Sequence, residues 1–337
     1  MKVSELGEIR LVNFISGIIK DFSDQKAVPW QKLITGPGDD AASWRGDDLI
    51  NLATVDSLIE NVHYTRELLD WTSLGWKALA INLSDIAAMG GVPRYTLISL
   101  GLPPDTEIDN VTSFYRGMLE LANQSGVAIV GGDTDCTPLI SVSVTLFGVT
   151  DTPEHLLLRS SAKPGELVAV TGNPGNAGGG LRLLQKKKQE LNDVEKILKQ
   201  SFWRPVPRLF EGRLLVEAGI KTAIDISDGL IVDLERICQA SHTGARIFVD
   251  DIPISPALKE VMGEESLEMS MAGGEDYELL FSGTREAIEH VKQMTKCPIT
   301  IIGEMTFEEP GKVQLYRKNG EKFNISKSGW DHFSRWM

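Results

Sequence analysis

The sequence predicts an α/β (α+β) protein that folds into two domains. Its 337 residues are too many for one ordinary hydrophobic core. Short apolar segments typical of strands alternate with longer helical segments along the chain. Polar turn residues and a proline between Thr150 and Glu154 indicate a boundary there. We therefore expect an N-terminal domain of residues 1–150 and a C-terminal domain of residues 151–337.

The composition is that of a globular protein from a reducing compartment. Hydrophobic residues make up 42% and charged residues 24% of the chain. No apolar run reaches the roughly 18 residues of a membrane-spanning helix, and the start of the chain reads as an amphipathic helix, so we expect no signal peptide and no membrane partner. Cys136, Cys238 and Cys297 are widely spaced without a CxxC pair, which argues against a zinc site or disulfides and favours a cytoplasmic location.

The net charge of −13 makes nucleic acid a poor candidate partner, because the chain has no basic blocks. Acidity does not exclude small phosphorylated molecules, since divalent cations can bridge carboxylates to phosphates. What matters is whether the acids are scattered or grouped.

The segment from Ala78 to Gly91 predicts a buried helix that carries an acid. It is rich in helix formers, nearly all small or apolar, and it ends in two glycines that suit a helix C-terminus. A helix that is apolar on every side belongs in a core. Asn82 and Asp85 nevertheless share one face of this helix with Ala78 and Met89. A buried carboxylate is costly unless it meets a cation, a donor or a metal, so Asp85 is a candidate metal ligand. Asn82 either joins that site or braces the backbone.

Two further acids follow predicted strands in the first half of the chain. Leu49–Val55 leads to Asp56, and Gly126–Val130 leads through two glycines to Asp133. An acid at a strand end commonly faces a ligand, although it can equally cap the next turn. Paired glycines let the backbone approach a ligand closely.

An acidic turn, Gly38-Asp39-Asp40, stands before the first of these strands. For an isolated Gly-Asp-Asp, a plain turn is the simpler interpretation. Adjacent acids repel each other, however, and a metal could hold both.

The densest acidic element of the second half is Asp225-Ile226-Ser227-Asp228. Two aspartates flank a serine at a predicted helix start, where capping explains one of these residues and leaves the others unexplained. The glycine-rich stretch 171–180 follows a predicted strand, as in many phosphate sites, but a tightly packed turn explains it equally well.

Together the acids form a pattern, because they lie at strand ends, at glycine turns or inside apolar segments. Oxygen-only ligands select hard cations, so we expect several Mg²⁺ ions around a polyphosphate. No nucleophile and base pair is evident, which suits phosphoryl transfer, since that reaction depends on positioning and charge neutralisation. The acids are Asp39, Asp40, Asp56, Asp85, Asp133, Asp225 and Asp228.

Eight motifs, taken in order, resemble those of the thiamine-monophosphate kinases along nearly the whole chain. One such motif would be a weak signal, whereas eight in order are very specific. They are Gly38-Asp-Asp40, Asp56 with His63, Asn82-Leu-Ser-Asp-Ile-Ala-Ala-Met-Gly90, Gly131-Gly-Asp-Thr134, Arg159 with Lys163-Pro-Gly165, Asp225-Ile-Ser-Asp-Gly-Leu230, Gly273-Gly-Glu-Asp-Tyr-Glu-Leu279, and Trp330-Asp-His-Phe333.

The resemblance implies that ATP phosphorylates thiamine monophosphate to thiamine diphosphate by direct in-line transfer assisted by several Mg²⁺ ions. It also implies the two-domain fold of the aminoimidazole ribonucleotide synthetase superfamily, in which each domain is a mixed sheet with helices. There the N-terminal domains pair across a homodimer and the nucleotide lies in the cleft.

The resemblance implies no catalytic residue beyond ligands of metal and phosphate. Trp330 would stack on the cationic thiazolium ring, and Glu275 would add a complementary charge. Arg159 would bind phosphate oxygens in a bidentate manner through its guanidinium group. Val55 stands where the family usually has threonine, so only its backbone carbonyl could bind a metal. The implied Mg²⁺ ligands are Asp40, Asp56, Asp85, Asp133 and Asp225, assisted by Asp39, Asp228, Thr54 and Val55. The implied ATP contacts are Gly132, Arg159, Ser227 and Tyr115, and the implied substrate residues are His63, Glu275 and Trp330.

Two rival functions remain. The first is another superfamily enzyme, such as aminoimidazole ribonucleotide synthetase or selenophosphate synthetase. The former is disfavoured by the Asn82–Asp85 and Trp330–Phe333 motifs, and the latter because the N-terminus has no reactive cysteine near a glycine-rich segment. The second is a nucleotide-sensing protein without catalysis, and the presence of every expected acid counts against it.

Overall fold

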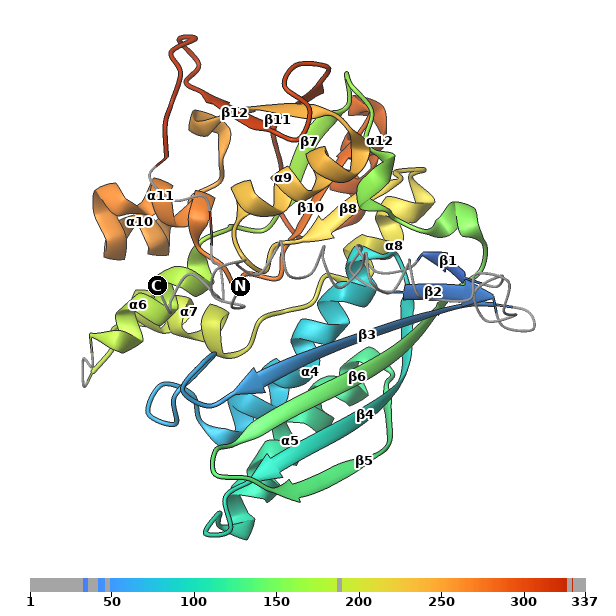
Figure 1. The fold of residues 1–337 in the computed structure, drawn as a ribbon. Helices are drawn as coiled ribbons and strands as arrows, with labels where there is room; N and C mark the ends of the chain where they lie inside the picture. Colours follow the sequence, from blue (N-terminus) through green and yellow to red (C-terminus); the bar gives the residue numbers. More distant parts are fainter. Residues whose placement is uncertain (1–32, 36–41, 46–48, 187–189, 326–328, 330–337) are drawn as a thin grey trace, which may run out of the picture.

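Two mixed sheets, each packed against helices and each using its own part of the chain, make up the protein (Figure 1). This confirms the predicted α/β (α+β) class with two domains. The structure, a computed structural model, describes residues 33–35, 42–45, 49–186, 190–325 and 329. The helix predicted over residues 4–20 and the predicted acidic turn at Asp39 and Asp40 lie outside these ranges.

The first sheet has six strands: β1 (Leu33–Thr35), β2 (Ala42–Arg45), β3 (Ile50–Ile59), β4 (Val92–Leu102), β5 (Ala128–Cys136) and β6 (Ser141–Thr150). Their order across the sheet is β1-β2-β3-β6-β4-β5. In the described part of the sheet, β4 and β5 run parallel and the other neighbours run antiparallel. The strand β6 ends at Thr150, next to the predicted boundary.

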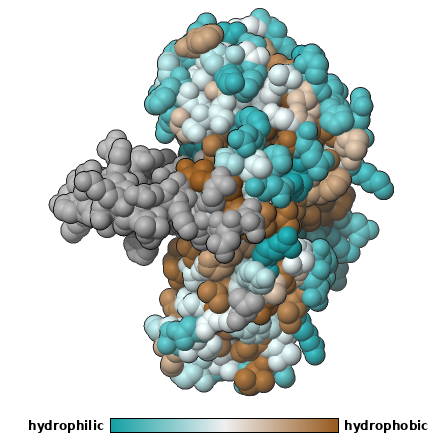
Figure 2. Space-filling view, turned by 90° about the vertical axis from the view of Figure 1, so that its right-hand side faces the viewer, coloured by the Kyte–Doolittle hydropathy of each residue, from teal (hydrophilic) through white to brown (hydrophobic). Residues whose placement is uncertain are grey.

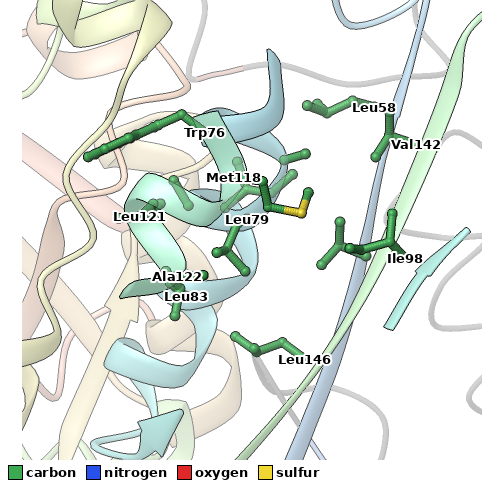
Figure 3. Close-up of a cluster of buried hydrophobic side chains, with 14 of the residues drawn as sticks. Leu58, Trp76, Leu79, Leu83, Ile98, Met118, Leu121, Ala122, Val142 and Leu146 are labelled. Carbon is green, nitrogen blue, oxygen red and sulfur yellow. The ribbon is translucent and has the colours of Figure 1, made fainter. Parts of the chain in front are cut away.

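Helices α4 (Trp71–Ala88) and α5 (Ile108–Ser125) cover one face of this sheet, and no described helix or strand covers the other, which we call the open face (Figure 1). The predicted helix at Ala78 is the C-terminal half of α4, which is buried almost all round. Figure 3 shows the core between the two layers, where Leu79 of α4 and Met118 of α5 point toward Ile98 and Leu146 of the sheet.

The second sheet also has six strands: β7 (Leu167–Thr171), β8 (Thr222–Asp225), β9 (Gly244–Phe248), β10 (Leu279–Gly283), β11 (Ile299–Thr306) and β12 (Val313–Tyr316). Their order is β12-β9-β11-β7-β10-β8, and β12 and β9 are the parallel pair. Helix α9 (Leu230–Ser241) shares a core with one face, and α8 (Leu209–Glu217) and α12 (Arg285–Met294) share a core with the other. Helices α6 (Asn176–Gln185), α7 (Asp193–Trp203), α10 (Pro256–Met262) and α11 (Ser266–Ala272) pack together beside this sheet. Single 3-10 turns occupy Pro153–His155, Arg159–Ser161, Val249–Asp251 and Gly263–Glu265.

Helix α4 also joins the two halves of the molecule. Ala87 and Ala88 at its C-terminal end belong to the same apolar cluster as Leu215 of α8. A Cβ atom on Gly212 of α8 would lie only 2.3 Å from the carbonyl oxygen of Ala87. The two helices are therefore in backbone contact, and α4 is part of the cores of both halves.

Two strands are longer than predicted, and this moves two candidate acids. Strand β3 continues through Asp56 because it pairs with β6 from Ile50 to Ile59. Strand β5 continues through Asp133 because it pairs with β4 as far as Cys136. Both acids thus lie inside a strand, and the expectation that they stand at strand ends was wrong.

The charged sequence from Gln185 to Gln200 predicts one exposed helical stretch, and the structure corrects this prediction. In the described residues, α6 ends at Gln185 and α7 begins only at Asp193. The cause is a capping box, in which the Asn192 side chain accepts from the Glu195 backbone N–H while Glu195 reaches back to that of Asn192. No described helix is both long and apolar enough to cross a membrane.

The crossing of α4 and α5 depends on two glycines. A Cβ on Gly117 would lie 1.8 Å from the carbonyl oxygen of Thr72, and one on Gly75 would lie 1.8 Å from that of Phe114. We therefore expect Gly117→Ala to push the helices apart and to lower the free energy of unfolding by about 2 kcal/mol or more. Urea denaturation measures this. Gln124→Ala, at an exposed position of α5, is the control and should leave the midpoint unchanged. Equal midpoints for the two variants would show that the helices do not depend on this contact.

Candidate active site

Four of the predicted acids meet around one cavity between the two halves of the molecule. Its volume is about 250 Å³. Strand β3 contributes Asp56, and helix α4 contributes Asp85. Asp225 is the last residue of β8, and Asp228 lies in the turn that follows it. Arg159, Thr54, Val55, His63, Ser227 and Glu275, also named by the sequence, line the same cavity. We call it the acid cavity.

Asp85 is held in place by the neighbouring strand. The hydroxyl of Thr54 donates to the Asp85 carboxylate at 2.5 Å. Thr54 and Asp56 lie on the same face of β3, because residues two apart in a strand point the same way. Burial raises the pKa of Asp85 well above its usual range, and the charges of Asp56 and Asp225 raise it further.

Burial raises the pKa values of Asp56 and Asp225 as it raises that of Asp85. Burial raises the pKa of Asp56 to about 7, helped by the charges of Asp225, Glu275 and Asp228. Burial also raises the pKa of Asp225, while a hydrogen bond from Ser84 and the charge of Arg159 oppose the rise. Since nearby carboxylates disfavour one another's charged forms, this cavity favours either protons or cations.

Two residues that the sequence reasoning missed organise the turn at Ser227. The carboxylate of Asp233 accepts hydrogen bonds from the backbone N–H groups of Ser227, Asp228 and Gly229, each at 3.1 Å. Arg236 then bridges Asp233 and Asp228, with 2.5 Å to each. The prediction that a serine or aspartate of the 225–228 segment caps α9 was therefore wrong, because Asp233, one turn inside the helix, accepts these N–H groups instead. An acid in the first turn was the available signal.

The donor set fits a hard divalent cation. Among the described residues, no three His, Cys, Asp or Glu side chains lie close enough to share one ion. Mg²⁺ usually takes one or two protein carboxylates and completes its shell with water and substrate phosphates. Carboxylates spaced around a cavity, with room for a phosphate between them, suit that chemistry better than a closed cage. Asp56, Asp85 and Asp225 would hold Mg²⁺ so that each ion meets one or two of these carboxylates, with phosphate oxygens and water as its other ligands.

A larger cavity of about 570 Å³ adjoins the acid cavity. It is lined by the loop after β3, by α6 and α11, and by the loop that follows α11. The two cavities share His63, Ser227, Asp228 and Glu275. We call it the substrate-sized cavity. Trp330 lies outside the described residues, but its neighbour Gly329 lines this cavity.

His63 is oriented by its own loop. Its Nδ1 accepts a hydrogen bond from the Ile59 backbone N–H at 3.0 Å. A ring whose Nδ1 accepts carries its proton on Nε2, so this contact favours the neutral tautomer with an Nε2–H donor.

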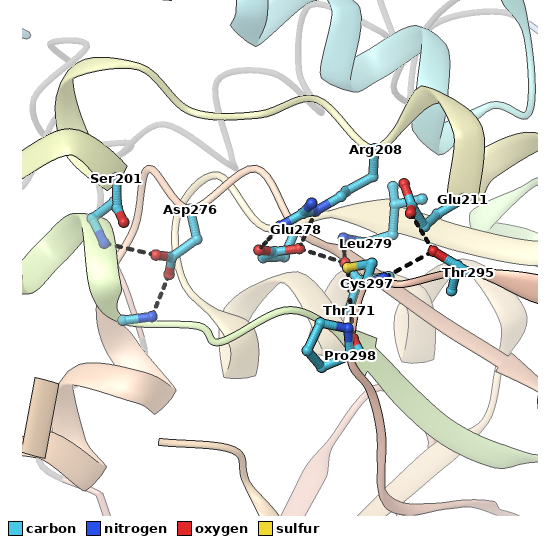
Figure 4. A network of polar contacts seen from close by, with 12 residues as sticks. Thr171, Ser201, Arg208, Glu211, Asp276, Glu278, Leu279, Thr295, Cys297 and Pro298 are labelled. Carbon is cyan, nitrogen blue, oxygen red and sulfur yellow. Dashed lines mark hydrogen bonds and ion pairs between the residues drawn. The ribbon is translucent and has the colours of Figure 1, made fainter. Parts of the chain in front are cut away.

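The glycine-rich stretch 171–180 is explained by packing and by an internal acid. Asp276 accepts from the backbone N–H groups of Gly175 at 2.5 Å and Ala177 at 2.9 Å, so its carboxylate occupies the position at the start of α6 that a phosphate would take (Figure 4). A Cβ on Gly180 would lie 2.1 Å from the carbonyl oxygen of Leu198. The glycines let α6 pack closely on α7.

Glu278, two residues further on, has a structural partner set as well. Its carboxylate accepts from Thr171 Oγ1 at 2.6 Å and from the Arg208 guanidinium at 2.6 and 2.5 Å (Figure 4). This pair links β10 to the segment before α8.

Three predicted site residues do not reach either cavity within one chain. Asp133 is exposed and pairs in register with Ser99 on the open face of the sheet. Asp56 lies on the opposite face, because the residues of β6 and β4 that are in register with it lie on the face covered by the helices. Gly132 is explained locally, because a Cβ there would lie 1.9 Å from the carbonyl oxygen of Ile98. Tyr115 packs edge-to-face on Phe114 beside the core.

Asn82 braces the backbone rather than joining the site. Its Nδ2 donates to the carbonyl oxygen of Ala78 at 3.0 Å within α4, and the side chain is fully buried. Asp39 and Asp40 lie outside the described residues.

Comparison with known proteins places this architecture in a class. Models of the AIR synthase related protein match the chain twice, with the N-terminal domain at residues 38–150 and the C-terminal domain at residues 163–315. The fold is thus that of an AIR synthase related protein.

Sequence identity to individual relatives shows which family within this class the chain belongs to. The thiamine-monophosphate kinase of Escherichia coli (strain K12) is 37% identical over 306 residues, which cover 89% of this chain and 92% of the relative. That of Aquifex aeolicus (strain VF5) is 33% identical over 336 residues, which cover 99% and 100%. The chain belongs to the thiamine-monophosphate kinase family.

Solved structures agree with this assignment. AaThiL complexed with AMPPCP and TMP superposes with a TM-score of 0.86 at 32% identity, covering 98% of this chain and 99% of that one. The thiamine-monophosphate kinase of Stenotrophomonas maltophilia K279a gives 0.76 at 32% identity, covering 93% and 96%. The hydrogenase maturation protein HypE in complex with ATP gives 0.66 at only 17% identity, covering 96% and 93%, and shares the fold alone.

The raised pKa values predict an unusual pH dependence of stability without Mg²⁺. Buried carboxyls such as Asp56, with a pKa of about 7, and Asp276, with a pKa of about 8, bind protons more tightly in the folded state than in the unfolded state. Their protonation therefore favours folding, and the contribution is lost as the pH rises from about 4 to about 8. We expect the melting temperature of the metal-free protein to fall between about pH 5.5 and about pH 8.

Mg²⁺ should offset part of this fall, because it competes with protons for Asp56 and the other carboxylates of the acid cavity. At saturating Mg²⁺ we expect a rise in melting temperature of about 4 °C at pH 8 and less than half of that at pH 5.5. Differential scanning calorimetry at constant ionic strength, with Na⁺ replacing Mg²⁺ as the control, measures both effects. An equal rise at both pH values would contradict a metal site made of these carboxylates.

Proposed function

We propose that this chain transfers the terminal phosphoryl group of ATP to the phosphate of thiamine monophosphate, producing thiamine diphosphate. The observation that carries the proposal is the junction of the two cavities. A small cavity rich in carboxylates suits metal-bound phosphates, and a larger one beside it has room for an organic substrate. The thiamine-monophosphate kinase relatives and the AaThiL structure with AMPPCP and TMP support the same pairing of ligands.

The ATP phosphates would lie in the acid cavity. Asp56, Asp85 and Asp225 would hold Mg²⁺, with Asp40 and Asp228 assisting. When bound there, Mg²⁺ would offset phosphate charge and orient the reacting groups. Arg159 would meet phosphate oxygens with its guanidinium, and Ser227 would offer its hydroxyl at the junction.

The acceptor needs no strong base, because the phosphate oxygen of the substrate is already ionised. The residues of the junction therefore act by placing the two phosphates in line and by excluding water. His63, held through Nδ1 in its neutral form, can donate from Nε2 to the acceptor phosphate. Glu275 and Trp330 would recognise the cationic thiazolium ring.

We also propose a homodimer that covers the open face of the first sheet. Tyr95 and Leu97 on β4 and Val55 and Ile59 on β3 expose apolar side chains there. Figure 2 shows apolar residues spread over the lower half of one side of the molecule. An apolar sheet face of this kind typically packs against a partner.

The dimer would also account for Asp133. Within one chain it lies on the opposite face of the sheet from Asp56, so it can serve as a ligand only in the assembled pair. The enzyme should work in the cytoplasm, since all three of its cysteines are free thiols.

The decisive experiment incubates purified protein with ATP, Mg²⁺ and thiamine monophosphate and follows thiamine diphosphate by chromatography. We expect product from the wild type. We expect Asp85→Asn to lower kcat at least about a hundredfold, because it removes a carboxylate that offsets phosphate charge. Its circular dichroism and melting temperature should stay close to those of the wild type, since asparagine keeps the shape and the bond from Thr54.

The other outcomes decide between the rivals. If the wild type makes no thiamine diphosphate, the kinase proposal is wrong. ATP binding without turnover would favour a nucleotide sensor, and turnover of a different phosphate acceptor would favour another superfamily enzyme. An unfolded Asp85→Asn protein would make Asp85 structural.

The dimer is tested with Leu97→Asp. A charge at this 38% exposed position should separate the subunits, so light scattering should give the mass of two chains for the wild type and of one chain for the variant. Ile108→Asp is the matched control, because Ile108 is 74% exposed at the start of α5, away from the open face. A wild type with the mass of one chain would contradict the dimer.

A further inference from the structure

Lys77 carries a fully buried charge that has no role in the proposed reaction. It lies on α4, and its side chain is only 2% exposed. Its Nζ donates to the carbonyl oxygen of Phe202 at 3.0 Å, lies 3.6 Å from the centre of the Phe202 ring, and forms an ion pair with the carboxylate of Glu275. All of these partners belong to the second half of the chain. Burial lowers the pKa of Lys77, and the charge of Glu275 opposes that shift.

Glu275, the partner of Lys77, stands at the junction of the two cavities and lines both. Its backbone adopts a left-handed conformation with φ of 72°, which is unfavourable for a residue that is not glycine. Its N–H donates to the carbonyl oxygen of Ser227 at 2.7 Å. The backbone of Glu275 is thus held by the turn at Ser227, whereas its carboxylate is held by Lys77.

A purely structural role does not require the charge of Lys77. Other contacts already join the same elements, because Trp76 Nε1 donates to the carbonyl oxygen of Pro205 at 2.9 Å and Trp203 Nε1 donates to that of Leu68 at 2.6 Å. Methionine could fill the same space against Phe202 without the cost of burying an ammonium group. What methionine cannot do is hold a carboxylate.

The charge matters at the junction because an anion must pass there. The phosphate of the acceptor would lie beside Glu275, and a carboxylate without a partner would repel it. The charge of Glu275 already reaches Asp56, whose pKa it helps to raise. An ammonium group in contact with Glu275 offsets that charge and keeps the carboxylate from swinging toward the acid cavity.

We propose that Lys77 is a positioning residue that holds the Glu275 carboxylate where the two cavities meet and offsets part of its charge, so that the phosphate of the acceptor can approach while Glu275 still faces the thiazolium ring. This inference rests on the proposed kinase function and adds a residue to it. Lys77 does not touch the substrate, and it acts only through Glu275.

The test is a double-mutant cycle in the kinase assay with Lys77→Met, Glu275→Gln and the double variant. Lys77→Met should raise the KM for thiamine monophosphate about tenfold and leave the KM for ATP within about twofold. In the Glu275→Gln background the same substitution should change the KM for thiamine monophosphate by less than about twofold, because the charge that Lys77 offsets is gone. Trp76→Phe, which loses a neighbouring contact without a change of charge, should leave this KM unchanged.

Three outcomes would overturn the inference: an unchanged KM in Lys77→Met, an equal rise in both backgrounds, or an equal rise in Trp76→Phe. If Lys77→Met is too unstable to purify, Lys77→Gln should show the same rise. If neither variant folds, the charge is needed for stability and the inference is wrong. A wild type that makes no thiamine diphosphate would instead refute the proposed function, so the two failures are distinguishable.

Discussion

A buried helix that carries charged side chains is stable only where each charge finds a partner, and α4 is such a helix. Thr54 on the first sheet bonds Asp85, Asn82 bonds the helix itself, and Glu275 from the second half pairs with Lys77. The charged residues of α4, Lys77 and Asp85, are therefore both paired only when the two halves of the chain have packed around it. The same packing creates the acid cavity, so the assembly of the fold and the assembly of the site are one event.

The site is shaped by two interlocked backbone segments of the second half. Asp233 holds the turn at Ser227 by accepting three backbone N–H groups. The loop at Glu275 then bonds that turn, through Glu275 N–H to Ser227 and Tyr277 N–H to Ile226. Left-handed backbone at both Glu275 and Tyr277 is tolerated because these contacts over-determine it. Rigid placement of this kind suits phosphoryl transfer, in which positioning and charge neutralisation carry most of the catalysis.

The fold alone does not decide the chemistry. HypE shares the architecture at 17% identity, and a shared fold of that kind hosts different reactions. What separates the possibilities is the set of side chains at the junction of the cavities. His63 and Glu275 come from loops of different halves, and both line the two cavities at once.

The sequence by itself determined the fold class, the core helix at Ala78 and the membership of Asp56, Asp85, Asp225 and Asp228 in one acid cluster. Hydrophobic periodicity indicates where the helices and strands lie, and an acid inside an apolar segment indicates that its carboxylate needs a cation, a donor or a metal as a partner. Only the tertiary structure decided which face of the sheet each acid occupies, because that depends on the pairing register, and a one-residue shift of register moves a side chain to the other face. That is why Asp133 lies away from the acid cavity in one chain. Only the tertiary structure, likewise, showed that Asp276 caps α6 and that Lys77 meets Glu275. Each of these contacts joins residues about a hundred or more positions apart, and no local pattern in the sequence records such a pairing.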